Sequence, residues 1–194
     1  MGRNLINYPK DVGTNTTTLL LIKIFLNSVI STPNTRFMSI DLANFYLMTP
    51  LKRPEFAKIK LSDIPEEIIQ EYQLHEKATP DGWVYIRCIC GMYGLPQAGS
   101  LGHDLLEKRL NEAGYHQSPI VPGLWKHTTR LIQFTLVVDN FGIKYTSLND
   151  DNHLINTLKK HYDVSVDNTG CKYVKINPNW DYDNGEVNLS MAPF

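Results

Sequence analysis

The sequence predicts an α+β fold with an antiparallel sheet on one side and helices on the other. Segments with the periodicity of amphipathic helices alternate irregularly with short apolar or alternating segments that are typical of strands. Two apolar segments, LIQFTLVV (131–138) and FGIKYTS (141–147), are separated by only two residues, which predicts a β-hairpin and antiparallel pairing. The 194 residues are 42% hydrophobic and 20% charged, which suits one domain with a sizeable core.

The first part of the chain predicts a loop, a helix and a strand. Residues 1–15 are polar and contain proline and glycine, which favours an extended or loop structure. Residues 14–31 have a wide apolar face and are followed by Pro33, so we expect a helix that packs against a sheet. Residues 36–41 alternate and end in an acid, which predicts a strand.

The middle of the chain predicts two more strands, two helices and a loop. Strand patterns occupy residues 54–61 and 83–89, and an amphipathic helix with acids in its first turn is expected over 62–72. Residues 91–99, GMYGLPQAG, are rich in glycine and therefore predict a loop. Leucines on one side of residues 100–115 predict a helix after it.

The last part of the chain, after the hairpin, predicts one helix and two strands. Residues 149–162 carry acids early and lysines late, which matches a helix dipole. Residues 172–177 and 186–190 are expected to be strands on either side of a DYDNG turn.

Composition and charge exclude several classes of protein. The net charge is −1, so no global positive field indicates a polyanionic partner, although a local basic groove stays open. Three cysteines, Cys88, Cys90 and Cys171, are too few for a disulfide framework, and we expect buried free thiols in a reducing compartment rather than a zinc site. The most apolar run, Leu19–Leu26, is too short to span a bilayer and does not resemble a signal peptide. We therefore expect no membrane partner and no secretion.

Two aspartates come at strand ends and are the candidates for chemistry. Asp41 ends the strand over 36–41, and Asp139 follows the apolar run that ends at residue 138. Taken alone, Asp41 is explained as the N-cap of a helix over LANFY (42–46), and Asp139–Asn140 as a two-residue hairpin turn. If the two strand ends lie side by side, however, the carboxylates form a site for Mg²⁺.

Three segments resemble, in order, the A, B and C motifs of a known family. FMSIDLANFY, GMYGLPQAG and FTLVVDNFGIKY are similar to those motifs in reverse transcriptases of LTR retrotransposons, in particular copia-like and related Pol polyproteins. The resemblance extends from about Asn7 to the C-terminus, including LKKHYDVSVDNTGCKYVKINPNWDY and VNLSM. It implies a polymerase palm over about 16–177, with an antiparallel sheet backed by helices near 16–31, 98–114 and 149–161. Residues 52–90 would form a partial fingers element.

The resemblance also implies roles for individual residues. Asp41 and Asp139 match ligands of the two catalytic metal ions that serve template-directed transfer of dNTPs onto a primer 3′-OH, with Mg²⁺ as the expected ion and Mn²⁺ as the alternative. Asn140 occupies the second position of the motif C pair. Tyr46 matches the aromatic steric gate that favours dNTP over rNTP, and core packing is its alternative explanation. Gln97 matches a motif B glutamine near the incoming nucleotide, with a surface turn as the alternative. The implied partners are an RNA or DNA template-primer, dNTP and other regions of a Pol polyprotein, in a cytoplasmic retroelement particle or in the nucleus.

Two features depart from the family pattern. Asn140 stands where the family has a second aspartate, so the site loses a full negative charge and we expect weaker metal binding and low polymerase activity. The N-terminal fingers, thumb and ribonuclease H regions of the family are expected to be missing. Three hypotheses follow: a reverse transcriptase palm fragment, a catalytically inactive relic that acts as a nucleic-acid-binding or scaffold module, and an unrelated α+β domain whose acids are caps and turns.

Overall fold

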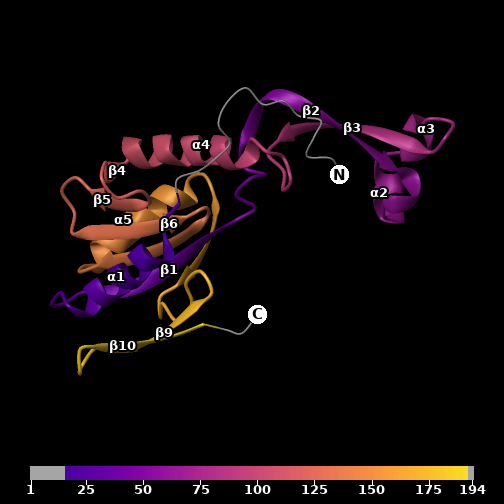
Figure 1. The fold of residues 1–194 in the computed structure, drawn as a ribbon. Helices are drawn as coiled ribbons and strands as arrows, with labels where there is room; N and C mark the ends of the chain where they lie inside the picture. Colours follow the sequence, from indigo (N-terminus) through magenta and orange to yellow (C-terminus); the bar gives the residue numbers. More distant parts are fainter. Residues whose placement is uncertain (1–15, 192–194) are drawn as a thin grey trace.

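A six-stranded antiparallel sheet forms the main body of the protein (Figure 1). The computed structural model describes residues 16–191. The strand order is β4-β5-β6-β7-β1-β8, with every neighbouring pair antiparallel. The strands are β1 (Arg36–Ala43), β4 (Tyr115–Gln117), β5 (Leu124–His127), β6 (Ile132–Val137), β7 (Asn140–Tyr145) and β8 (Asp163–Asp167). The predicted α+β class with antiparallel pairing is confirmed.

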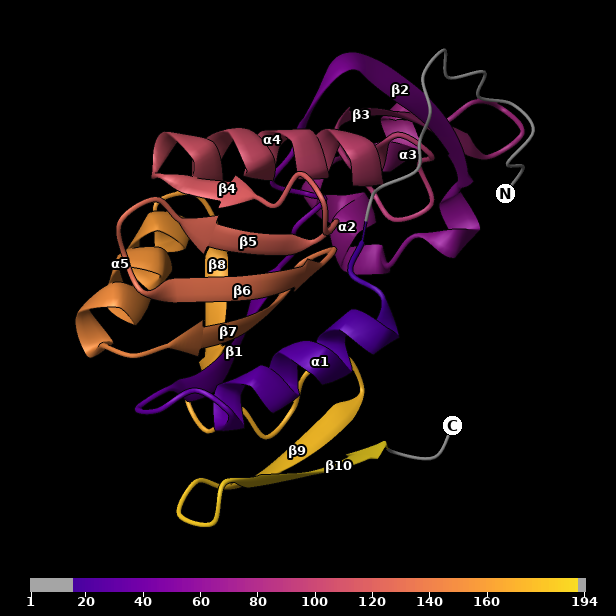
Figure 2. The same cartoon turned by 60° about the vertical axis from the view of Figure 1, so that its left-hand side comes forward.

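Two further pairs of strands lie outside this sheet. The ribbon of β2 (Pro50–Lys60) and β3 (Trp83–Cys90) extends away from the main body, with α2 (Glu66–Glu71) and α3 (Leu74–Lys77) near its far end (Figure 1). A short 3₁₀ turn, Leu61–Asp63, follows β2. The second pair, β9 (Ile176–Asp181) and β10 (Glu186–Met191), lies beside α1 (Leu19–Ile30) (Figure 2).

Helices cover both faces of the main sheet. Leu106 and Leu110 of α4 (Ala98–Glu112) and Leu154 and Leu158 of α5 (Leu148–Lys159) belong to the large core cluster with the apolar side chains of β1, β6 and β7. Helix α1 packs on the other face, where its buried side chains meet Phe37, Tyr173 and Ile176. The expectation that helices lie on only one side of the sheet is therefore wrong. Successive side chains of β1 point to opposite faces of the sheet, so both faces need apolar cover. Phe37 points to the α1 side, while Met38 points to α4 and α5.

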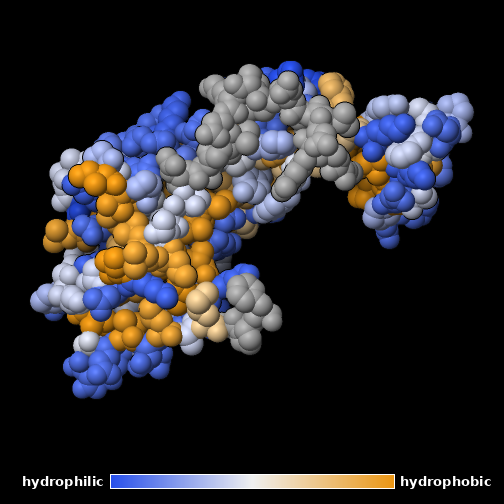
Figure 3. Space-filling view, viewed as in Figure 1, coloured by the Kyte–Doolittle hydropathy of each residue, from blue (hydrophilic) through white to orange (hydrophobic). Residues whose placement is uncertain are grey.

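Only one face of α1 is buried, as the spacing of its apolar residues predicts. Ile22, Phe25, Leu26 and Val29 are buried, and they recur at the spacing of one helix face. The outer face still exposes Leu20 (68%) and other apolar residues, namely Leu19 and Ile24. Figure 3 shows this hydrophobic surface over α1. The side chain of Thr18 caps the helix by accepting a hydrogen bond from the amide of Leu21.

Several expected elements are shifted or absent. The loop expected over 91–99 is shorter, since α4 begins at Ala98. Residues 42–46 form no helix, because Leu42 and Ala43 complete β1 and turns follow. The strand expected over 172–177 begins only at Ile176. Strands β4, β5 and β8 and helix α3 were not expected. The predicted loop over 1–15 lies outside the described residues.

Two further expectations concern the cysteines and membrane-spanning helices. Cys88 is buried, Cys90 is partly buried and Cys171 is exposed, and all three are free thiols. The expectation of buried thiols is therefore wrong for Cys171. Among residues 16–191, no helix is both long enough and apolar enough to cross a membrane.

Tyr173 joins the C-terminal segment to the main sheet. Its ring is 2% exposed, and its hydroxyl lies 3.0 Å from both the side-chain oxygen and the carbonyl oxygen of Thr135 in β6. The ring reaches this position because residue 142 of β7 is a glycine. A Cβ at Gly142 would lie 2.6 Å from the Tyr173 ring, which is closer than side chains pack.

Replacing this glycine is therefore expected to destabilise the protein. The Gly142→Ala methyl group forces the Tyr173 ring out of a packed site, and overpacking of this kind costs about 1–3 kcal/mol. Urea unfolding followed by circular dichroism measures the change. Tyr173→Phe is the control, because it removes only the hydroxyl and is expected to cost about 1 kcal/mol. An unchanged unfolding midpoint for Gly142→Ala would contradict the packing described above.

Candidate functional site

The β6–β7 turn and the end of β1 meet at one end of the main sheet. The ladder between β6 and β7 closes with Val137 opposite Asn140, so the two turn residues are Val138 and Asp139. The amide of Leu42 in β1 donates to the carbonyl of Asp139 at 3.1 Å, which fixes the turn beside β1. The turn expected at Asp139–Asn140 is thus one residue too late, because Asn140 is already paired in β7.

Val138 occupies a strained backbone conformation within this turn. Its φ is 58°, in the left-handed region that glycine adopts freely and a β-branched residue rarely adopts. Residues held in such regions cluster at functional sites, where the surrounding structure enforces them. Here the paired strands on both sides and the Leu42–Asp139 hydrogen bond supply the constraint.

Asp41 lies directly opposite Asn140 in the β1–β7 pair. Directly opposed residues of an antiparallel pair place their side chains on the same face, so Asp41 and Asn140 are neighbours. Asp41 is inside a strand and caps no helix, which excludes the capping explanation. The residue as a whole is exposed, but its carboxyl group is partly withdrawn from water. This desolvation, together with the nearby charge of Asp139, raises the pKa of Asp41.

The Asn140 amide is bonded to the second carboxylate. Its Nδ2 donates to Oδ1 of Asp139 at 2.8 Å. One oxygen of Asp139 therefore accepts a hydrogen bond from a neutral amide. An aspartate at position 140 would instead repel the Asp139 carboxylate. The amide oxygen of Asn140 is a neutral ligand atom of the kind that divalent cations accept beside carboxylates. Asp41, Asp139 and Asn140 thus place carboxylate and amide oxygens at the same end of the sheet.

Tyr46 follows the end of β1 and lies near enough to Asp139 to be affected by its charge. Its ring packs against Tyr93 and Phe45, with centroid distances of 4.9 and 5.5 Å. Desolvation is the main cause that raises the pKa of the Tyr46 hydroxyl, and the charge of Asp139 raises this pKa further. Gly91 permits the close approach of the segment after β3, because a Cβ there would lie 2.7 Å from the carbonyl oxygen of Tyr46.

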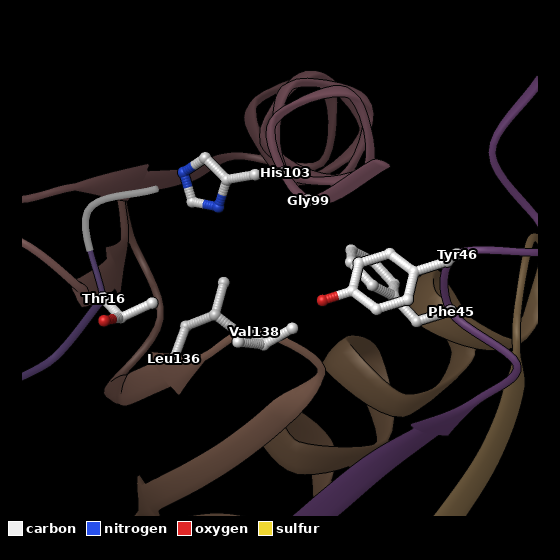
Figure 4. Close-up of a pocket in the computed structure, with 7 residues that line it drawn as sticks. All are labelled: Thr16, Phe45, Tyr46, Gly99, His103, Leu136 and Val138. Atoms are coloured by element: carbon white, nitrogen blue, oxygen red, sulfur yellow. The ribbon is translucent and has the colours of Figure 1, made fainter. Parts of the chain in front are cut away.

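A small cavity opens beside Tyr46. It is lined by the β6–β7 hairpin and by the first turns of α4, and Figure 4 shows the Tyr46 hydroxyl pointing into it. His103 and Gly99 face it from α4, and Leu136 and Val138 face it from the hairpin. Neither His103 nor Tyr93 was among the predicted site residues. In the sequence, His103 comes four residues after Gly99, a spacing that places both residues on one face of a helix and could have indicated that they line the same site.

Gln97 lies in a different environment. It is 2% exposed, and its Nε2 donates to Oε1 of Glu55 in β2 at 3.1 Å. Its amide oxygen is buried with no hydrogen-bond partner within residues 16–191. Asp41, Asp139, Asn140 and Tyr46 are thus brought together, whereas Gln97 connects α4 to the β2–β3 ribbon. A role for Gln97 in binding a nucleotide stays a prediction.

Two carboxylates at one sheet end are the kind of ligand that a hydrated divalent cation such as Mg²⁺ accepts. Mg²⁺ keeps several water ligands and is commonly held by one or two carboxylates plus substrate phosphates. Asp41 and Asp139 supply the two carboxylates. In the described part of the chain, no group of three or more histidine, cysteine, aspartate and glutamate side chains is placed to hold a metal ion. A tightly closed, all-protein metal cage is therefore not what these residues form.

The coupling of the two carboxylates gives a direct test of the geometry. Asp139→Asn is expected to lower the pKa of Asp41, because it removes the nearby negative charge. The pKa stays above that of a free aspartate, since desolvation is the larger cause and remains. A carboxyl ¹³C NMR titration measures it. Asp104→Asn, at an exposed position of α4, is the control that should leave the pKa of Asp41 unchanged. An unchanged Asp41 pKa in Asp139→Asn would show that the carboxylates do not interact.

Comparison of the chain with family models, with curated proteins and with solved structures finds no match in any of the three.

Proposed function

We propose that the chain is a reverse transcriptase palm from a retroelement Pol polyprotein, whose carboxylate pair binds Mg²⁺ or Mn²⁺ for template-directed transfer of dNTPs onto a primer 3′-OH. One observation carries this proposal. Asp41 and Asp139 are 98 positions apart in the sequence, yet β1–β7 pairing brings them together at one sheet end. These are the two positions that the motif resemblance assigns to metal binding.

In this proposal, the carboxylates bind the metal and the β6–β7 turn positions one of them for nucleotidyl transfer. The bound metal would lower the pKa of the primer 3′-OH and neutralise the developing phosphate charge. Asp41 and Asp139 would hold it, and the strained β6–β7 turn keeps Asp139 beside β1. No protein nucleophile is needed, since positioning and charge neutralisation carry the chemistry.

Tyr46 supports the choice of deoxynucleotides in this proposal. Its ring is fixed by Tyr93 and Phe45, and its hydroxyl lies near the Asp139 charge. A rigid ring beside the metal site would crowd a ribose 2′-OH. The β2–β3 ribbon with its two short helices covers most of residues 52–90, the segment assigned to the partial fingers. The cell compartment would be that of a retroelement particle or the nucleus.

The second candidate function is an inactive relic that serves as a nucleic-acid-binding or scaffold module. The observation that favours it is the Asn140–Asp139 hydrogen bond. An amide both lacks the charge of a second aspartate and occupies one oxygen of the ligand beside it. Two closely spaced divalent cations depend on such charge, so this site is expected to hold the second ion weakly.

Metal binding decides whether the carboxylate pair is a site at all. Mn²⁺ titration followed by electron paramagnetic resonance is expected to show binding in the millimolar range or tighter. Asp41→Ala should abolish it, because a single carboxylate remains, whereas the matched control Asp104→Ala should retain it. Equal binding by the protein and by Asp41→Ala would reject the proposed metal site.

Restoring the missing charge tests the proposed chemistry. A unit charge about 4 Å from another contributes roughly 4 kcal/mol at an effective dielectric constant of about 20, so Asn140→Asp should tighten metal binding by at least about tenfold. We also expect it to raise primer extension on an RNA template. Asn188→Asp adds the same charge at an exposed position of β10 and is the control. No gain in extension by Asn140→Asp, together with intact metal binding, would favour the inactive module.

A further inference from the structure

The β2–β3 ribbon has one face built from aromatic and cationic residues. Three directly opposed pairs follow one another along the ribbon: Phe56 with Arg87, Lys58 with Tyr85, and Lys60 with Trp83. Opposed residues share a face, and residues two apart on a strand share it as well. All six side chains therefore lie on one face, which we call the outer face. Each pair combines one aromatic ring with one positive charge.

This outer face is exposed to solvent. Phe56 is 73% exposed and Tyr85 is 63% exposed, and Lys58, Lys60 and Arg87 are exposed as well. The opposite face is the more buried one and carries the aliphatic residues and a thiol: Ala57, Ile59, Val84, Ile86 and Cys88. Large aromatic side chains that stay exposed beside one another commonly mark a binding surface. The hydrophobic effect alone would have placed these rings on the inner face.

The charge of the outer face is positive. None of its six residues is acidic, and Glu55 lies on the opposite face, where it accepts hydrogen bonds from Gln97 and Arg53. Asp81 lies in the turn that precedes β3, and its pKa is lowered chiefly by Thr79 and to a smaller extent by Lys58. Arg53, Glu55 and Arg87 line an open hollow beside Phe56, and Arg53 is ion-paired with Glu55 there, so among residues 16–191 Arg87 supplies the unpaired positive charge at this end. The face thus offers cations at both ends of the ribbon.

The rings and charges are held in position by each other. The ammonium groups of Lys58 and Lys60 lie 4.3 and 5.5 Å from the centroid of the Trp83 ring. Cation–π contacts of this kind orient lysine side chains that otherwise move freely. Phe56 and Tyr85 take part in no comparable contact within residues 16–191 and present open ring faces.

We propose that the outer face of the β2–β3 ribbon binds single-stranded nucleic acid. Bases stack on Phe56 and Tyr85, while Lys58, Lys60 and Arg87 contact phosphates. Alternation of aromatic rings and cations is the chemistry that such strands require, because every base has an apolar ring face and every linkage carries a negative charge. The inference uses only ribbon residues and does not depend on the carboxylate pair.

The spacing of the rings favours a single strand over a duplex. Phe56 and Tyr85 are diagonal neighbours across the ribbon, which corresponds to a separation of about 7–8 Å. Stacked bases in a duplex are about 3.4 Å apart, so successive bases must separate to reach successive rings. Splayed bases are available only in single-stranded RNA or DNA.

The test is fluorescence anisotropy of labelled oligouridine with the full chain, in buffer containing EDTA so that metal binding plays no part. Phe56→Ala/Tyr85→Ala is expected to weaken binding by roughly tenfold or more, because each stacked base contributes that order of affinity. Lys58→Gln/Arg87→Gln should weaken binding and reduce the slope of log affinity against log salt by about 1.4, since each phosphate contact adds about 0.7. The aromatic variant should keep the slope of the parent protein.

Matched controls are available on the same molecule. Tyr72→Ala removes an exposed aromatic ring near α2, and Lys126→Gln removes an exposed cation of β5, and neither should change the affinity. Unchanged affinity in both ribbon variants, or equal losses in the controls, would overturn the proposal. So would equal affinity for an RNA duplex, for polyglutamate or for phosphatidylserine vesicles, because each would assign the positive face to another partner. Loss of binding in the ribbon variants with intact Mn²⁺ binding supports the proposal independently of the carboxylate site.

Discussion

The pairing of β1 with β7 is the constraint on which the rest of the structure depends. Strand β1 lies between β7 and β8, so its register sets the position of three strands and of the helices packed on them. The register is fixed by Met38, Ile40 and Leu42, which must all face the large core cluster. A slip of one residue would turn these side chains to the α1 side and would bury Asp41. The same pattern that builds the core therefore places Asp41 beside Asn140.

Segments with a strong local pattern could be predicted from the sequence, and those that depend on tertiary contacts could not. Helix α1 and the β6–β7 hairpin have long apolar patterns, so their type was clear. Strand β4 has only three residues and β5 has four, which is too short for periodicity to detect. The strand expected over 172–177 failed because Val174 and Lys175 have φ values of 43° and 65°. Valine strongly favours extended structure, and packing of Tyr173 and Ile176 in the core overrides that preference.

The candidate site shows the same division. That Asp41 and Asp139 would meet could be inferred from their positions at strand ends. The exact turn could not, because local preferences favour asparagine rather than valine in a positive-φ position. Val138 takes it because the β1–β7 register and the Leu42–Asp139 hydrogen bond leave no alternative. The burial of Gln97 depends on where the ribbon carries Glu55, which no local pattern encodes.

The overall net charge does not show how unevenly charge is distributed along the chain. Strands β2 and β3 contain five cations and one acid, whereas the chain as a whole has a net charge of −1. The sheet end instead concentrates two carboxylates, and desolvation by burial, followed by the nearby charge of Asp139, raises the pKa of Asp41. A phosphate backbone is attracted by the ribbon but repelled by the bare carboxylates. A bound cation would remove that repulsion. In the two proposals, the ribbon therefore binds a strand without metal, whereas the sheet end approaches one only when a cation is bound.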